Sequence, residues 1–215
     1  MKHSLNWKLE LACLMLFSTL SLASPQDSTT TTDKLRPTPM AFLQGHDARV
    51  QDVLAQSPGD SLSAKLRQKV KDHINAAFDF EELSRLSLGE HWEARSETER
   101  AEFVQVFSGI IEEQNLDNFL RYYREGKIDY QEEKIDSAKA TVSALVPLEK
   151  GEAVDIIYYL HLVEDQWRVY DLVIEDTSTA NGNRRRYARY IKKHSYEKLI
   201  QKLNEQLDRL MQQNH

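Results

Sequence analysis

The side chains best suited to acid–base or metal chemistry are few and scattered along this sequence. Histidines such as His73, His91, His161 and His194 stand far apart, and an isolated histidine is more often a surface or core residue than a catalytic one. Neighbouring acids occur as adjacent pairs, for example Glu112-Glu113, and adjacent side chains point in different directions on a helix or strand. We therefore expect no catalytic residues and no metal site.

Phosphate-cradling and thiol chemistry are also missing. The seven glycines occur singly, and neither G-x-G-x-x-G nor G-x-x-x-x-G-K-[ST] is present, so no known loop for nucleotide hydrolysis is available. Cys13 is the only cysteine, which leaves a single thiol for a nucleophile, a thiolate metal site or a disulfide. We expect no cofactor, and a protein that is not an enzyme.

One basic run stands out in a chain whose formal net charge is −6. It begins at Arg184, Arg185 and Arg186 and continues to His194. Such a run suits a phosphate head group or an anionic membrane surface; alternatively, it is the exposed side of a helix, with Lys and Arg favoured near its C-terminal end. We predict head-group or membrane-surface contact for the three arginines. The acidic balance of the chain predicts no nucleic-acid binding.

The N-terminus has the pattern of a secretory signal peptide. An apolar run from Leu11 to Leu22 follows Lys2 and Lys8 and ends at Ala23. This run is too short for a membrane span, which needs about 20 residues. We predict a signal peptide over residues 1–23, a disordered tether rich in Thr, Ser and Pro over residues 24–40, and one domain over residues 41–215. Cleavage would remove Cys13, and a cysteine-free exported chain suits an oxidising periplasm.

Helical patterns flank the centre of the domain. Residues 41–77 predict two helices interrupted by the breaker at 57–60. Ser96 and Glu99 have capping-box spacing, and an apolar stripe of helical period follows from Phe103 to Ile111. After a turn signal at residues 181–183, Ser195 is expected to cap a last helix.

A strand pattern lies between these helices. Residues 127–136, 139–149, 152–163 and 166–176 are rich in Val, Ile and Tyr, and their short connections suit an antiparallel meander. The third strand also has apolar groups on its second face, at Ile157, Tyr159 and Val163. We therefore expect a sheet that is covered on both faces, or one whose second face lines an apolar cavity. The order of helices, sheet and helices predicts an α+β fold.

Several short segments, in this order and spacing, resemble one known family. They are Phe78-Asp79-Phe80, Leu88-Gly89-Glu90-His91-Trp92, Ser96-Glu97-Thr98-Glu99-Arg100, Phe103 with Phe107, and Trp167-Arg168-Val169-Tyr170-Asp171-Leu172-Val173-Ile174-Glu175 followed by Ser178. Across about residues 60–205, this set resembles the MlaC family of toluene-tolerance auxiliary transport proteins.

The resemblance implies a cone-like, nuclear-transport-factor-like core, with a curved four-stranded antiparallel sheet wrapped by helices. Helical N- and C-terminal additions would enclose an apolar pocket for acyl chains. It also implies a monomeric periplasmic carrier of phospholipid, which touches membranes transiently and supports outer-membrane lipid asymmetry and solvent tolerance. Its partners would be an outer-membrane lipoprotein complex and an inner-membrane ABC transporter with an MCE-domain ring. A hopanoid-associated branch of the family leaves a hopanoid or another lipid open as the cargo.

A carrier of this kind needs an apolar lining and no catalytic group. Two acyl chains expose about 30 methylenes, each worth about 0.8 kcal/mol on leaving water, so free transit of a lipid is opposed by roughly 20 kcal/mol. We expect the cargo to contact apolar residues of the long helix and the strands, with Ser178 near the mouth. The predicted lining is Phe107, Ile110, Ile111, Val142, Val146, Ile156, Tyr158, Leu160, Leu172 and Ile174.

Two other classes of function remain open at this point. A small-molecule enzyme on the same cone-shaped scaffold would need a polar cluster in its pocket, such as His161 with Asp155 or Asp171. A non-catalytic adaptor would instead expose the stripe Leu199, Leu203 and Leu210 of its last helix to a partner.

Overall fold

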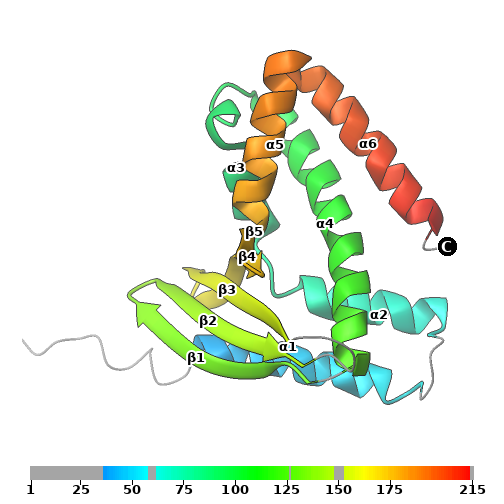
Figure 1. Cartoon of the computed structure of the whole chain (residues 1–215), viewed down its shortest axis with the longest axis vertical. Coiled ribbons are helices and arrows are strands. Elements are labelled where there is room, and N and C mark those ends of the chain that lie inside the picture. The colour runs from blue at the N-terminus through cyan, green and yellow to red at the C-terminus, as the bar shows by residue number, and fades with distance from the viewer. Residues whose placement is uncertain (1–35, 58–61, 126, 148–152, 214–215) are drawn as a thin grey trace, which may run out of the picture. The chain divides into compact units, whose positions relative to one another are not determined.

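The computed structural model describes residues 36–57, 62–125, 127–147 and 153–213. The predicted signal peptide, most of the predicted tether and the connection between the second and third predicted strands lie outside these ranges. The described chain orders its elements as helices, then a sheet, then helices (Figure 1). This is the predicted α+β class.

The described ranges contain six α-helices and one short 3-10 helix, η1. The helices are α1 (Pro39–Leu54), α2 (Ala64–Asn75), α3 (Phe80–Leu88), η1 (Gly89–His91), α4 (Glu97–Glu125), α5 (Thr179–Lys193) and α6 (Tyr196–Gln213). The strands are β1 (Asp129–Asp136), β2 (Lys139–Val146), β3 (Val154–Val163), β4 (Gln166–Ile174) and β5 (Thr177–Ser178).

Side-chain caps set where the helices begin. The Ser96 amide donates to Glu99 Oε2 at 2.8 Å and the Glu99 amide to Ser96 Oγ at 3.3 Å, which confirms the predicted capping box at α4. Ser195 caps α6 as predicted, since its Oγ accepts from the Lys198 amide at 3.3 Å. Thr38 caps α1 and Pro39 is its first residue. The last two residues of the predicted tether are therefore helical, because cap and proline start α1 earlier than its apolar pattern indicates.

The strands form one antiparallel sheet in the order β1-β2-β3-β4-β5, which confirms the predicted meander. Within the described ranges the sheet has five strands where four are predicted. Glu175 and Asp176 both have positive φ, of 46° and 62°, and this tight turn folds the chain back so that β5 pairs with the end of β4. The extra strand has only two residues, too few to produce an alternating pattern in the sequence.

The predicted turn at residues 181–183 is wrong, because these residues lie in the first turns of α5. Ser178 caps the helix by accepting from the Asn181 amide at 3.0 Å. Asn183 is buried, and burial against the rest of the protein offsets the low helix propensity of Asn and Gly.

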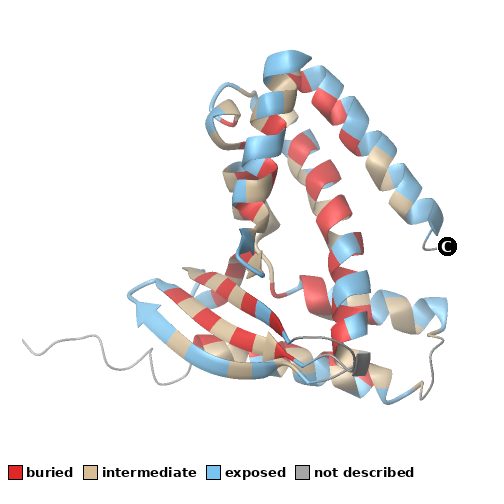
Figure 2. Cartoon of the chain, viewed as in Figure 1, coloured by how far each residue is buried: buried red, intermediate tan, exposed pale blue. Residues whose placement is uncertain are grey.

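The buried side chains form two separate clusters. We name the first the sheet core: it packs one face of β2, β3 and β4 against α1, α2 and the C-terminal half of α4. We name the second the helical core: it lies among α3, the N-terminal half of α4, α5 and α6. Figure 1 shows α4 running beside α6 at one end and reaching α2 at the other, and Figure 2 shows buried residues along both halves of α4. One long helix thus serves both cores.

Within the described ranges, no helix combines the length and apolar character that a membrane crossing needs.

Candidate functional site

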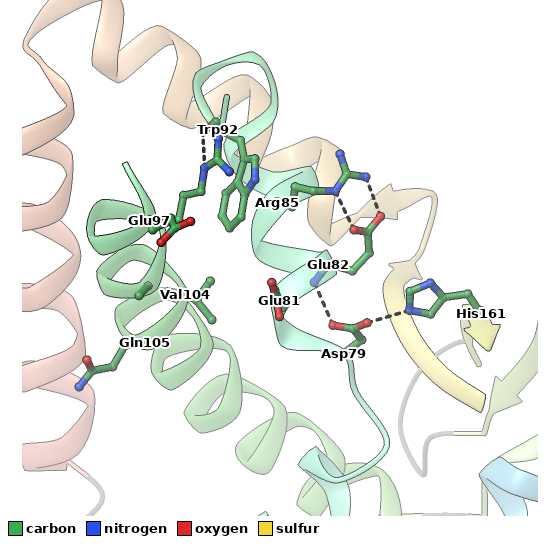
Figure 3. A pocket seen from close by; sticks show the side chains of 11 residues that line it. Asp79, Glu81, Glu82, Arg85, Trp92, Glu97, Val104, Gln105 and His161 are labelled. Carbon is green, nitrogen blue, oxygen red and sulfur yellow. Dashed lines mark hydrogen bonds and ion pairs between the residues drawn. The ribbon is translucent and has the colours of Figure 1, made fainter. Parts of the chain in front are cut away.

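A cavity of about 660 Å³ opens between α3, α4 and the end of β3 (Figure 3). Its apolar wall is formed by Trp92, Ala101 and Val104. The remaining lining is polar or charged and consists of Asp79, Glu81, Glu82, Arg85, Glu97, Arg100, Gln105 and His161. More of the surface that faces the cavity is apolar than polar, but an acyl chain packed here would still cost these eight side chains part of their hydration.

Asp79 and His161 form a hydrogen-bonded pair in this cavity. Asp79 Oδ1 accepts from the Glu82 amide at 2.9 Å and so caps α3, while Oδ2 lies 2.9 Å from His161 Nε2. The Asp79 amide also donates to the Val169 carbonyl at 2.8 Å, which ties the start of α3 to β4. The ring of His161 lies 5.0 Å from that of Tyr170. The pair therefore joins a helix start to the sheet.

The two arginines of the cavity already have anionic or carbonyl partners. Arg85 donates two hydrogen bonds of 2.7 Å to the carboxylate of Glu82, and these bonds raise the pKa of Arg85 above its usual value. Arg100 donates to the Trp92 carbonyl at 3.0 Å and lies over the Trp92 ring. Glu81 and Glu97 also line the cavity, which leaves it with more carboxylates than guanidinium groups.

The lining of the cavity supplies a His–Asp pair but no nucleophile to complete a triad. No Ser, Thr, Cys or Tyr is among its lining residues, and the nearby Tyr170, whose ring contacts that of His161, is not part of the lining. The pairing of His161 with Asp155 or Asp171, which the enzyme alternative needs, is not formed: Asp155 is exposed, and Asp171 accepts from Ser178 Oγ at 2.6 Å. In the described part of the chain, no three His, Cys, Asp or Glu side chains are grouped so as to hold a metal ion.

The residues predicted to line a lipid pocket lie in the two cores and not around this cavity. Seven belong to or pack against the sheet core: Val142, Val146, Ile156, Tyr158, Leu160, Leu172 and Ile174. Three belong to the helical core: Phe107, Ile110 and Ile111. The structure does not bring the two groups into one cluster. Their contact with a lipid stays a prediction.

The second face of β3 is not covered as predicted. Ile157 and Tyr159 are half-buried and Val163 is exposed. Tyr159 contacts Tyr170 across the strands, with ring centroids 6.2 Å apart. This cross-strand pair accounts for the half-buried position of Tyr159. His161 lies on the same face of β3 and lines the cavity of Figure 3, so this face borders that cavity at one end.

Ser178 lies at the start of α5 and the three arginines lie near the middle of this helix. The Ser178 hydroxyl both caps α5 and donates to Asp171, so it is engaged within the fold. Arg184, Arg185 and Arg186 are all exposed on α5. The stem of Arg184 crosses Gly89, where an added Cβ would lie 2.7 Å from Arg184 Cδ. Gly89 has a φ of 60°, which is a second reason for glycine at this position.

A buried polar cluster was not predicted from the sequence. Asp47 on α1 accepts hydrogen bonds from Tyr123 at 2.5 Å and from Tyr130 at 2.6 Å. The hydroxyl of Tyr158 is fully buried and finds no hydrogen-bond partner among the described residues. The cluster joins α1, the end of α4, β1 and β3. Asp47 is 76 and 83 residues from its two partners, so no local spacing could have indicated it.

The stripe that the adaptor alternative requires is not exposed. Leu199 and Leu203 are each only 2% exposed, and Leu210 packs against the helical core. The last helix therefore uses its apolar face within the chain, and the prediction of an exposed stripe is wrong.

Comparison with known proteins identifies the family. The family model described as "MlaC protein" matches residues 46–205. The chain belongs to the MlaC family. This confirms the resemblance found in the sequence and extends it toward the N-terminus, into α1. No curated protein is similar enough in sequence to match.

A solved structure shares the fold of this MlaC protein. It is the phospholipid-binding protein from Ralstonia solanacearum, determined in complex with a phospholipid. The TM-score is 0.64 at 22% sequence identity, and the alignment covers 78% of this chain and 98% of the other. At this identity the similarity establishes the fold.

The motifs of the MlaC resemblance meet around the cavity in Figure 3. Asp79, Trp92 and Arg100 come from three of these segments, and all three line it. The Asp79 carboxylate caps α3, and Arg100 ties the first turns of α4 to the turn at Trp92. The family motifs thus set how α3 and α4 begin, whatever the cavity binds.

Proposed function

We propose that this protein is a periplasmic carrier that binds phospholipid acyl chains and moves lipid between the outer membrane and an inner-membrane ABC transporter. The match to the MlaC family over residues 46–205 carries the proposal. A protein of the same fold is described as phospholipid-binding and was solved with a phospholipid. The lack of a nucleophile in the cavity described above also favours binding over catalysis.

To hold a lipid, the protein must open either the sheet core or the helical core. The charged cavity is a poor place for hydrocarbon, whereas the sheet core offers a continuous apolar surface on β2, β3 and β4. In this structure α1 and α2 cover that surface. We propose that acyl chains enter between these helices and the sheet, exchanging helix–sheet contacts for lipid–sheet contacts of similar apolar character.

Native mass spectrometry of the mature protein, purified from the periplasm, tests the proposal. We expect a mass increase equal to one lipid, and solvent extraction should release a phospholipid. A hopanoid in the extract would keep the carrier and change its cargo. A mass without any lipid, unchanged after incubation with phospholipid vesicles and with the transporter, would contradict a carrier function.

Photo-crosslinking locates the acyl chains. Tyr158 and Tyr159 are neighbours on β3 with side chains on opposite faces, and Tyr158 faces the sheet core while Tyr159 is half-exposed. We expect benzoylphenylalanine in place of Tyr158 to label the bound lipid on irradiation, and the same group in place of Tyr159 to label little or none.

The two positions are matched controls for one another, because they share a strand and an aromatic side chain. Labelling from position 159 but not from 158 would place the lipid on the half-exposed face and overturn the proposed entry. Labelling from a third photoreactive group, in place of Phe107, would assign the chains to the helical core instead.

A further inference from the structure

The helix α5 concentrates positive charge in an acidic protein. Six of its 15 residues are Lys or Arg, and none is Asp or Glu, whereas the whole chain has a formal net charge of −6. We define the basic stripe by five of these residues, which are Arg185, Arg186, Arg189, Lys192 and Lys193. Arg184 is not included, because its stem lies across Gly89.

The stripe occupies a single face of the helix. At 100° per residue its five positions fall within an arc of about 120°. Ala180, Asn183 and Tyr187 lie on the opposite side and are buried, whereas all five members of the stripe are exposed. Tyr187 anchors the helix by packing edge-on against Phe103 and Phe107 of α4. The stripe is therefore held in a fixed orientation.

The described residues do not neutralise this charge. None of their ion pairs involves a member of the stripe. Arg186 donates to the side-chain amide oxygen of Asn183 at 2.6 Å, which is a neutral partner. Lys202 of α6 lies over the ring of Tyr190, with its Nζ 4.8 Å from the ring centroid, and adds another cation to this side of the protein.

The helix dipole explains only part of the stripe. Cations are favoured in the last turn of a helix, which accounts for Lys192 and Lys193. Arg185 and Arg186 lie near the middle of α5, where the dipole has little effect, and like charges spaced three and four residues apart weaken a helix. A ligand outside the described chain would offset this repulsion.

The surface fits a layer of anionic head groups better than a protein partner. Protein interfaces usually have an aromatic or apolar centre inside a polar rim. The large hydrophobic residues that are exposed among the described residues are Ile135, Val163 and Met211, none of which lies on α5. A face with charge and no apolar centre matches lipid phosphates, which attract cations within about 8 Å at physiological salt.

We propose that the basic stripe of α5 docks the protein reversibly on membranes that carry anionic lipids. The evidence for docking is the charge of the stripe, and it does not depend on any cargo. Only the purpose of docking, which is to bring a lipid carrier to its source of lipid, rests on the function proposed above.

Vesicle flotation with the mature protein tests the docking. We expect binding to phosphatidylcholine vesicles that contain about one third phosphatidylglycerol, weak binding to pure phosphatidylcholine, and release as salt rises from about 0.1 to about 0.5 M. Each charge removed should lower the partition coefficient about fivefold. The variant Arg185→Gln, Arg189→Gln, Lys192→Gln, Lys193→Gln should therefore bind several hundredfold more weakly, at about fivefold per charge.

A matched variant removes four exposed cations elsewhere: Lys65→Gln, Lys69→Gln, Lys127→Gln and Arg209→Gln. It has the same net charge and should retain most of the binding. Equal losses in both variants, or no preference of the original protein for anionic vesicles, would overturn the docking face. Loss of capture of an acidic protein partner in the stripe variant, with vesicle binding unchanged, would assign the stripe to a protein interface instead. Lipid content measured in each variant by mass spectrometry separates a docking defect from a failure of carriage.

Discussion

Replacing Phe107 with alanine is expected to lower the free energy of unfolding of the lipid-free protein by about 3–5 kcal/mol. Phe107 is 0% exposed. Its ring stacks on that of Phe103, with centroids 5.4 Å apart, and meets the edge of Tyr187 at 6.1 Å. Truncation would leave a cavity lined by rigid aromatic groups that cannot collapse into it.

Urea unfolding of delipidated and lipid-loaded protein measures the effect and separates two roles for this residue. If Phe107 is a core residue, as its packing here indicates, the loss is the same in both forms. If it lines the lipid site instead, the lipid-free protein is nearly unaffected and the loss is confined to the loaded form. Met211→Ala is the control, since Met211 is 45% exposed and its truncation should change the unfolding free energy by less than about 0.5 kcal/mol.

Replacing Asp47 with alanine is expected to cost roughly 2–4 kcal/mol, because the hydroxyls of Tyr123 and Tyr130 then lose their acceptor. Each unsatisfied buried donor costs about 1–3 kcal/mol. The variants Tyr123→Phe and Tyr130→Phe complete double-mutant cycles with Asp47→Ala. Removing the acceptor and a donor together should cost less than the sum of the two single changes. Additive losses in these cycles, measured by urea unfolding, would show that the cluster does not act as a unit.

The same carboxyl gives a pH dependence of known sign. Burial raises the pKa of Asp47 above its usual value of 3.8, against the opposing effect of the two tyrosine hydrogen bonds. The folded state then holds this proton more tightly than the unfolded state. The contribution of Asp47 to stability is therefore present below pH 3.8 and is lost as the pH rises through the folded-state pKa. The side chain of the Asp47→Asn variant has no proton to lose. Between pH 3.8 and the folded-state pKa of Asp47, the free energy of unfolding of this variant should therefore fall less than that of the original protein.

These two sites have consequences for loading. Asp47 ties α1 to β1 and to the end of α4, and α1 covers the sheet surface where we propose that acyl chains enter. Loosening this tie should make lipid exchange faster in the Asp47→Asn protein. Phe107 belongs to the other core, so its truncation should leave the rate of exchange through the sheet core unchanged.

The spacing of residues close together in the sequence was sufficient to predict the features that depend only on local interactions. The capping box at Ser96 and Glu99, the cap at Ser195 and the four long strands depend on residues within a few positions of one another. The family was also within reach of the sequence, because its motifs keep their order along the chain and match over residues 46–205. The short strand β5 and the helical start at Pro39 were missed because a tight turn and a single proline, not a period, define them.

The sequence by itself thus determined the fold class, the meander and the family. Only the tertiary structure decided which side chains meet. It paired His161 with Asp79 across 82 residues, where the sequence suggested Asp155 or Asp171, and it assembled Asp47 with Tyr123 and Tyr130. It also divided the predicted lipid contacts between two cores. The physical reason is that periodicity shows which face of a helix or strand is apolar, but not which neighbouring element buries that face.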